Sequence, residues 1–129
     1  MGIFDNVFGG KKEPKEEKSL PWKQLTEMSQ LDDVVTASKG KTVAILKHST
    51  TCGISRMVLR QLEREYDYPA EQVDFYYLDL KAYRSISNEI AQRFNVWHES
   101  PQLIVIRNGE AVYNASHSAI VASAIEQFV

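Results

Sequence analysis

The stretch TVAILKHSTTCGIS, residues 42–55, joins an apolar segment to the only cysteine of the chain. Residues 43–46 are four consecutive apolar residues, which is typical of a strand that is covered on both faces. After the cysteine, apolar residues recur at helical spacing: Ile54, Met57, Val58 and Leu62. We therefore predict that a central strand ends and a helix begins around Cys52, and that this turn carries the function.

The segment before this stretch predicts one further strand and one further helix. Residues 21–28 (PWKQLTEM) are typical of a short edge strand, because two polar residues interrupt its apolar positions. A helix is expected next, begun by a capping box of Ser29 and Asp32 and ending near residue 40. Both elements precede the central strand.

The C-terminal half predicts the remaining elements. Residues 73–80 (VDFYYLDL) indicate a strand, and Ser85 then begins a helix. Two strand-like runs within residues 103–116 are joined across Asn-Gly, the strongest short hairpin signal, and an amphipathic helix follows over residues 120–128. The order βαβαβαββα predicts an α/β fold, with a five-stranded mixed sheet flanked by helices on both faces.

Length and composition narrow the class of protein. The 129 residues, 43% of them hydrophobic, suffice for one domain with a packed core. A net charge of −2 with interspersed signs does not indicate a nucleic-acid surface. A single cysteine cannot form an internal disulfide, which favours a reducing, cytoplasmic location.

Residues 1–19 differ from the rest of the chain. Their second part, GGKKEPKEEKS, has almost no apolar content and predicts a disordered tail, so that the folded domain spans residues 20–129. Asp5 interrupts the apolar residues at the start, and no hydrophobic region of a signal peptide follows. No stretch is long enough to span a membrane, and we expect binding to neither a membrane nor nucleic acid.

The position of Cys52 predicts a reactive sulfur. The first backbone N–H groups of a helix lack partners within the helix and carry partial positive charge, so they stabilise a thiolate and lower its pKa. Gly53 would leave these amides accessible, and Thr51 and Ser55 add hydroxyl donors. A low pKa accelerates attack only a few-fold, because nucleophilicity falls with it, but it makes the sulfur a better leaving group. The pattern therefore favours disulfide exchange over hydrolysis.

The alternative is that Cys52 is a small, inert core residue. Its neighbours are threonine, glycine and serine, which do not line a core, so we favour the reactive interpretation. Cys52-x-x-Ser55 has the spacing of a dithiol redox motif with the second sulfur replaced by oxygen. Such a chain needs a resolving thiol from outside. His48 could form an ion pair with the thiolate or lie on the surface, and the histidines are too scattered to predict a metal site.

The predicted order of elements, with a reactive cysteine after the second strand and a proline before the fourth, resembles the thioredoxin fold. In that fold the proline is cis and faces the cysteine, and the residue before it offers backbone groups to the bound disulfide. The resemblance assigns these positions to Pro101 and Ser100. A proline at this place is expected at the beginning of its strand, where it costs no ladder hydrogen bond.

Three segments together resemble the monothiol bacilliredoxin family: KHSTTCGISRM (47–57), YYLDLKAYRSISNEIAQRFNVWHESPQ (76–102) and SHSAI (116–120). The resemblance implies an enzyme that removes bacillithiol from S-bacillithiolated client proteins during oxidative stress. Cys52 would be the catalytic nucleophile, bacillithiol the thiol co-substrate, and no cofactor would be bound. Gly53 stands where the family usually has proline, and we expect a retuned pKa rather than lost activity. Lys47 would steer an anionic thiol, with a solvated lysine as the alternative.

Two other functions remain open. CGIS differs by one apolar residue from the CGFS motif of monothiol glutaredoxins, which carry iron–sulfur clusters between two monomers, but HESPQ and the absence of a downstream glycine pair disfavour that family. The other alternative is a non-catalytic thioredoxin-like adaptor. We expect a monomer that can form a Cys52-linked dimer on oxidation, and a substrate-binding set beside Cys52 that comprises Lys47, Thr51, Gly53, Ser55, Ser100 and Pro101.

Overall fold

The computed structural model describes residues 20–49 and 53–129. Five strands form one sheet in the order β1-β3-β2-β4-β5. They are β1 (Lys23–Gln24), β2 (Thr42–His48), β3 (Val73–Asp79), β4 (Gln102–Arg107) and β5 (Glu110–Ser116). The helices are α2 (Gln30–Ala37), α3 (Gly53–Glu65), α4 (Arg84–Arg93) and α5 (Ala122–Glu126). The predicted order of strands and helices is confirmed. The sheet is mixed, because β4 runs antiparallel to both of its neighbours, β2 and β5, whereas the other four strands run in the same direction.

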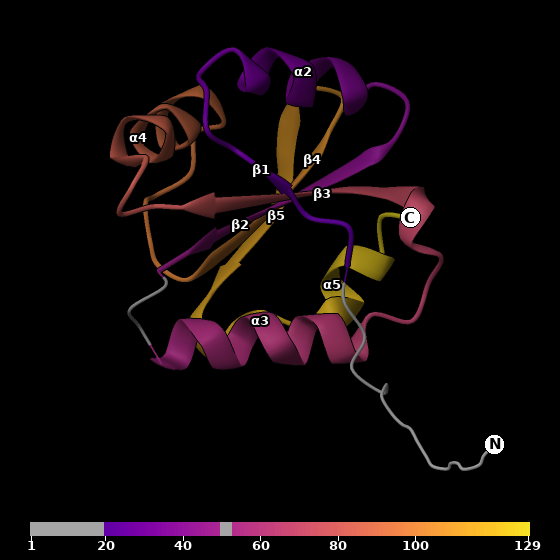
Figure 1. The fold of residues 1–129 in the computed structure, drawn as a ribbon. Coiled ribbons are helices and arrows are strands. Elements are labelled where there is room, and N and C mark those ends of the chain that lie inside the picture. The colour runs from indigo at the N-terminus through magenta and orange to yellow at the C-terminus, as the bar shows by residue number, and fades with distance from the viewer. Residues whose placement is uncertain (1–19, 50–52) are drawn as a thin grey trace, which may run out of the picture.

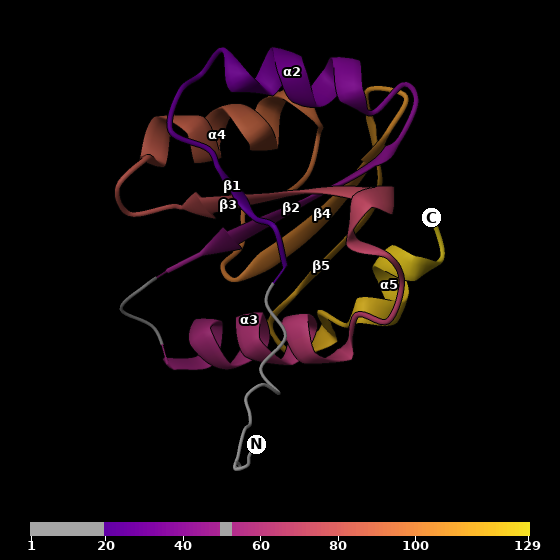
Figure 2. The same ribbon diagram turned by 45° about the vertical axis from the view of Figure 1, so that its right-hand side comes forward.

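The sheet lies between two layers of helices (Figure 1; Figure 2). Helices α3 and α5 cover one face and α2 and α4 cover the other, and each face buries its own apolar cluster. No helix among the described residues is long and apolar enough to cross a membrane.

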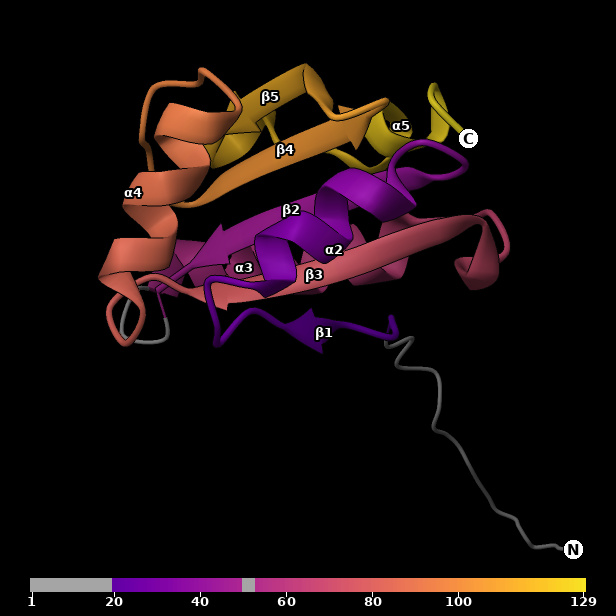
Figure 3. The same cartoon turned by 90° about the horizontal axis from the view of Figure 1, so that it is seen from above.

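Strand β2 is the centre of the sheet, as the apolar run in the sequence predicts. It pairs in parallel with β3 and antiparallel with β4, and all seven of its residues are buried. Its last pairings bring Lys47 opposite Gln102, the first residue of β4. Figure 3 shows α4 at the edge of the sheet where β2 and β3 end and β4 begins. This edge therefore collects the end of β2, the start of α3, helix α4 and the loop into β4.

The predicted hairpin is confirmed. Asn108 and Gly109 join β4 to β5, and both have positive φ angles, 54° and 77°. A two-residue turn of this kind matches the right-handed twist of the flanking strands. The backbone N–H of Gly109 also donates to Ser38 Oγ (2.8 Å), which links the turn to the end of α2.

The predicted capping box at the start of α2 is wrong. Ser29 has helical backbone angles and its side chain makes no capping hydrogen bond. The side chain of Gln30, the first residue of α2, makes the hydrogen bonds at this end of the helix instead. Its Oε1 accepts from the backbone N–H groups of Thr26 (2.8 Å) and Glu27 (3.0 Å). Its Nε2 donates to the carbonyl of Gln24 (3.0 Å) and so ties the helix to β1.

The C-terminal helix is shorter than predicted. Helix α5 spans only Ala122–Glu126, because a 3₁₀ turn occupies residues 117–119 and Val121 is extended. Ile120 and Phe128 lie outside the helix but still pack on the cluster beneath α3. The apolar spacing therefore identified core residues correctly but extended the helix too far.

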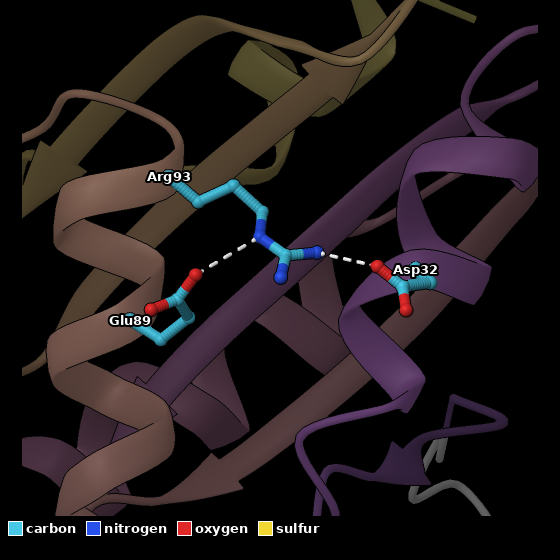
Figure 4. A network of polar contacts seen from close by, with 3 residues as sticks. All are labelled: Asp32, Glu89 and Arg93. Atoms are coloured by element: carbon cyan, nitrogen blue, oxygen red, sulfur yellow. Dashed lines mark hydrogen bonds and ion pairs between the residues drawn. The ribbon is translucent and has the colours of Figure 1, made fainter.

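Arg93 links the two helices on one face of the sheet (Figure 4). Its guanidinium lies 3.2 Å from Glu89, four residues earlier on α4, and 2.9 Å from Asp32 on α2. Asp32 is largely exposed, so the bridge lies in solvent.

Candidate active site

The candidate site lies where β2 ends and α3 begins. Thr51 and Cys52, both predicted site residues, lie outside the described part of the chain, and their roles stay predictions. The residues on either side of them are described: β2 ends at His48, and α3 begins at Gly53, directly after the cysteine. A hydrogen bond from the backbone N–H of Ser49 to Ser55 Oγ (3.1 Å) joins the two sides.

Ser55 is a buried polar residue on the face of α3 that meets the sheet. Besides the bond from Ser49, its Oγ lies 3.0 Å from Nδ1 of His48. The serine that stands in place of a second redox cysteine therefore holds the end of β2 against the first turn of α3. Its predicted contact with the sulfur of Cys52 stays a prediction.

His48 is buried, so a surface position is wrong for this side chain. Its ring packs near Tyr77 of β3, with ring centroids 5.1 Å apart. Burial lowers the pKa of His48, an effect that Arg56 adds to and that Asp79 and Ser55 oppose. The imidazole is therefore neutral near pH 7 and offers hydrogen bonds rather than a counter-charge for a thiolate.

Lys47 points to the opposite face of β2 and is fully buried, which rules out a solvated lysine. Its Nζ donates to the carbonyl of Ser87 in α4 (3.1 Å) and lies 3.2 Å from Nδ1 of His98. Burial lowers the pKa of Lys47 from 10.5 to about 8. The ammonium is therefore still protonated at neutral pH, although it lies inside the protein.

The loop into β4 brings the second predicted part of the site to the same edge. The peptide bond between Ser100 and Pro101 is cis, as the fold resemblance implies, and Pro101 is buried. The side chain of Gln102 shapes this loop, because its Nε2 donates to the carbonyl of Trp97 (2.8 Å). Since Gln102, the first residue of β4, pairs with Lys47, the loop ends beside the last residues of β2.

Three side chains around this edge are more exposed than predicted. Ile54 and Met57 belong to the apolar spacing of α3, yet both are exposed, because the buried face of the helix runs through Ser55, Val58 and Leu62. Trp97, a large aromatic side chain of the kind that is usually buried at least in part, is 89% exposed.

Gly53 is exposed, and a Cβ atom there would meet only the Arg56 guanidinium, 4.0 Å away. The backbone of the first turn is therefore sterically open at this residue, as the sequence suggests. Gly53 has no steric need to be glycine, because the Cβ atom of an alanine would find space at this position.

Two residues of this edge were missed by reasoning from the sequence. His98 was noted only as a scattered histidine, and Ser87 was not singled out, although both contact Lys47. The available signal was the pair Lys47–His48, which directly follows the apolar run of residues 43–46 in the same strand. Because side chains alternate along a strand, such a pair sends one ionisable group into each helix layer.

The geometry defines a class of protein. In thioredoxin-fold proteins a cysteine lies between the end of the central strand and a helix, and it faces a cis-proline that precedes the adjacent antiparallel strand. This chain has the same order of parts: Cys52 comes directly before the 13-residue helix α3, and the cis-proline Pro101 comes directly before β4. The solved structures agree. One described as a candidate oxidoreductase with a thioredoxin fold is 37% identical, with a TM-score of 0.68 over 81% of this chain and 89% of that one.

Two thioredoxins show the same fold at lower identity. Malassezia sympodialis thioredoxin is 22% identical, with a TM-score of 0.67 over 85% of this chain and 92% of its own. Schistosoma mansoni thioredoxin is 25% identical, with a TM-score of 0.62 over 82% and 96%. Within this class, the family model of the monothiol bacilliredoxin BrxC matches residues 23–125. The chain belongs to the monothiol bacilliredoxin family.

Proposed function

We propose that this chain removes bacillithiol from S-bacillithiolated proteins in the cytoplasm by thiol–disulfide exchange at Cys52. The Cys52 thiolate attacks the bacillithiol sulfur of the client's mixed disulfide. The bond between the client and bacillithiol breaks, and the client sulfur leaves as a thiolate that takes up a proton. The thiolate of a second low-molecular-weight thiol then attacks the new disulfide, releases Cys52 and leaves in a disulfide with bacillithiol.

Membership of the monothiol bacilliredoxin family carries this proposal, in a chain with a single cysteine. The described residues on either side of Cys52 support it. Helix α3 begins at the next residue, so its unpaired N–H groups and dipole favour a negative charge there. Ser55, at the second position of the motif, is buried and hydrogen-bonded to its neighbours. An oxygen there cannot resolve a mixed disulfide, so an external thiol must do so.

Intact-mass spectrometry tests the proposal. The reduced protein is mixed separately with oxidised bacillithiol and oxidised glutathione, and with a client peptide that carries a bacillithiol mixed disulfide. We expect an adduct of one bacillithiol and release of the free peptide. Both should vanish in Cys52→Ser, while the matched variant Ser85→Ala on the exposed start of α4 should behave as the wild type.

Other outcomes would contradict the proposal. An adduct with glutathione alone, or a coloured iron–sulfur dimer purified from cells, would favour a glutaredoxin-like carrier. A Cys52 thiol that titrates near its ordinary pKa of about 8.5 and forms no mixed disulfide would favour a non-catalytic adaptor.

A further inference from the structure

The contact between Lys47 and His98 determines which nitrogen of this histidine carries a proton. The Lys47 ammonium has only donors, and it lies 3.2 Å from Nδ1 of His98. Nδ1 must therefore accept, which leaves the proton of the neutral ring on Nε2. Ser87 Oγ lies 3.2 Å from the same Nδ1 and can donate to it as well. The ring is held from one side only, by Lys47 on β2 and Ser87 on α4.

The surrounding charges keep the His98 ring neutral. Burial lowers the pKa of His98, and the nearby cations Lys47 and Arg84 lower it further, while Glu99 opposes them. A neutral ring with an acceptor at Nδ1 has one donor left, the Nε2–H group. No partner for Nε2 lies among residues 20–49 and 53–129, and His98 is an exposed residue.

The buried charge of Lys47 is not neutralised by the protein. Within the described part of the chain no carboxylate lies within ion-pair distance of its Nζ, which meets only a carbonyl and an imidazole. The nearest acidic neighbour of His98, Glu99, accepts from Ser116 Oγ (2.7 Å) and lies 3.7 Å from Nδ1 of His117. A buried ammonium without a counter-ion is costly, and an anion at the surface in front of it would lower that cost.

Space for a ligand group lies beside His98. A groove of about 400 Å³ runs between the end of α4 and the following loop, with His98 and the exposed Trp97 among its lining residues. The loop continues to the cis peptide bond between Ser100 and Pro101, so His98 lies two residues before Ser100, the predicted disulfide-binding position.

We propose that His98, with the ammonium of Lys47 behind it, binds a carboxylate of the low-molecular-weight thiol that Cys52 exchanges. The Nε2–H group donates to the carboxylate, and Lys47 acts as a positioning residue that fixes the tautomer and supplies the positive charge. Lys47 would therefore attract an anionic thiol through His98 and not by direct contact. This inference rests on the proposed function, because it names the feature of the thiol that the site recognises.

Exchange kinetics with two matched caps test the proposal. One client peptide carries a mixed disulfide with bacillithiol (the carboxylate cap). A second carries a mixed disulfide with bacillithiol whose carboxylates are methyl esters (the methylated cap), so that the two caps differ mainly in charge. In His98→Leu we expect KM for the carboxylate cap to rise about tenfold with kcat little changed, because a tenfold effect is the usual size of a charged hydrogen bond. KM for the methylated cap should stay as in the wild type. His98→Gln keeps an outward amide donor and should restore part of the preference.

A control and a spectroscopic measurement separate this role from a merely structural one. His117→Asn changes an exposed histidine at a positive φ of 56°, which asparagine tolerates, and should keep the wild-type preference. In ¹⁵N NMR spectra of the wild type near pH 7, we expect a protonated Nε2 and an unprotonated Nδ1 for His98. In Lys47→Met the two tautomers should mix, and the preference for the carboxylate cap should fall.

The outcomes are distinguishable. If the wild type exchanges both caps but His98→Leu changes their ratio no more than His117→Asn does, the inference is overturned and the proposed function stands. A proton on Nδ1 of His98 in the wild type also overturns it. If the wild type exchanges neither cap, the proposed function fails and this inference fails with it.

Discussion

The two ends of β2 both bury polar side chains, but they use them differently. At the first end, Thr42 Oγ1 donates to the carbonyl of Phe128 and accepts from the guanidinium of Arg107 (3.0 Å). At the last end, Lys47 and His48 are ionisable, and burial lowers the pKa of each.

The first end attaches the C-terminus to the sheet through a hydroxyl, a guanidinium and a backbone carbonyl. One buried atom there, Arg107 Nε, has no hydrogen-bond partner among the described residues. The last end places two titratable groups under the start of α3 and α4, at a cost in stability. The difference predicts that polar burial at the first end affects stability alone, whereas at the last end it also affects the chemistry of the proposed site.

Replacing Lys47 should give the largest effect and should stabilise the protein. Its pKa of about 8, against an ordinary 10.5, means that the folded protein disfavours the charged form by roughly 3 kcal/mol. The Ser87 carbonyl loses a donor in Lys47→Met, so we expect a net gain of about 2 kcal/mol in the free energy of unfolding near pH 7. Urea denaturation measures this, with the exposed Lys39→Met as the control.

The same pair of variants predicts a pH dependence. Between about pH 8 and 10.5 the unfolded chain binds a proton at Lys47 that the folded protein has lost, so wild-type stability gains from this residue as the pH rises. The advantage of Lys47→Met should therefore shrink across this window. A constant difference between the two proteins would show that the folded ammonium has an ordinary pKa.

Ser55→Ala should destabilise the last end of β2, where Lys47 and His48 lie. It removes the acceptor for the Ser49 N–H and the partner of His48 Nδ1, both in a buried place, and we expect a loss of about 1.5 kcal/mol. Because these bonds join the residues flanking Cys52, the pH profile of Cys52 alkylation should also move. An unchanged profile would mean that Ser55 serves packing alone.

Thr42→Val should test the other end of β2. The variant keeps the shape of the side chain but loses the contacts with Arg107 and with the Phe128 carbonyl, and we expect a loss of about 1 kcal/mol in urea denaturation. The pH profile of Cys52 alkylation should stay as in the wild type. A shift in that profile would contradict the division between the two ends.

Arg93→Ala should have the smallest effect. Its bridge between α2 and α4 lies in solvent, where ion pairs contribute little, so we expect a loss below about 0.5 kcal/mol that fades at high salt. A loss as large as that of Ser55→Ala would show that the bridge in Figure 4 holds the two helices together.

The order of elements was predictable because its signals are local. The apolar run at residues 43–46 and the Asn108–Gly109 turn each act within a few neighbours. The capping box failed because Gln30 reaches back to residues 24–27, a choice that depends on where β1 lies.

The site was predictable in part for the same reason. The place of Gly53 at the start of α3 and of Pro101 before β4 follows from strand and helix boundaries and from the family resemblance, whereas the role of Cys52 stays a prediction. The contact between Lys47 and His98 joins residues 51 positions apart, and only the packing of α4 against the end of β2 brings them together.

Lys47 and His48 point to opposite faces of β2, and this alternation constrains the number of residues in the strand. One residue added or removed between Thr42 and Lys47 would turn the ammonium toward α3 and the imidazole toward α4, so that each layer received the wrong chemistry. The loops elsewhere can grow or shorten without this penalty. The number of residues in the innermost strand is therefore constrained by the helix layer that each of its two ionisable side chains has to reach.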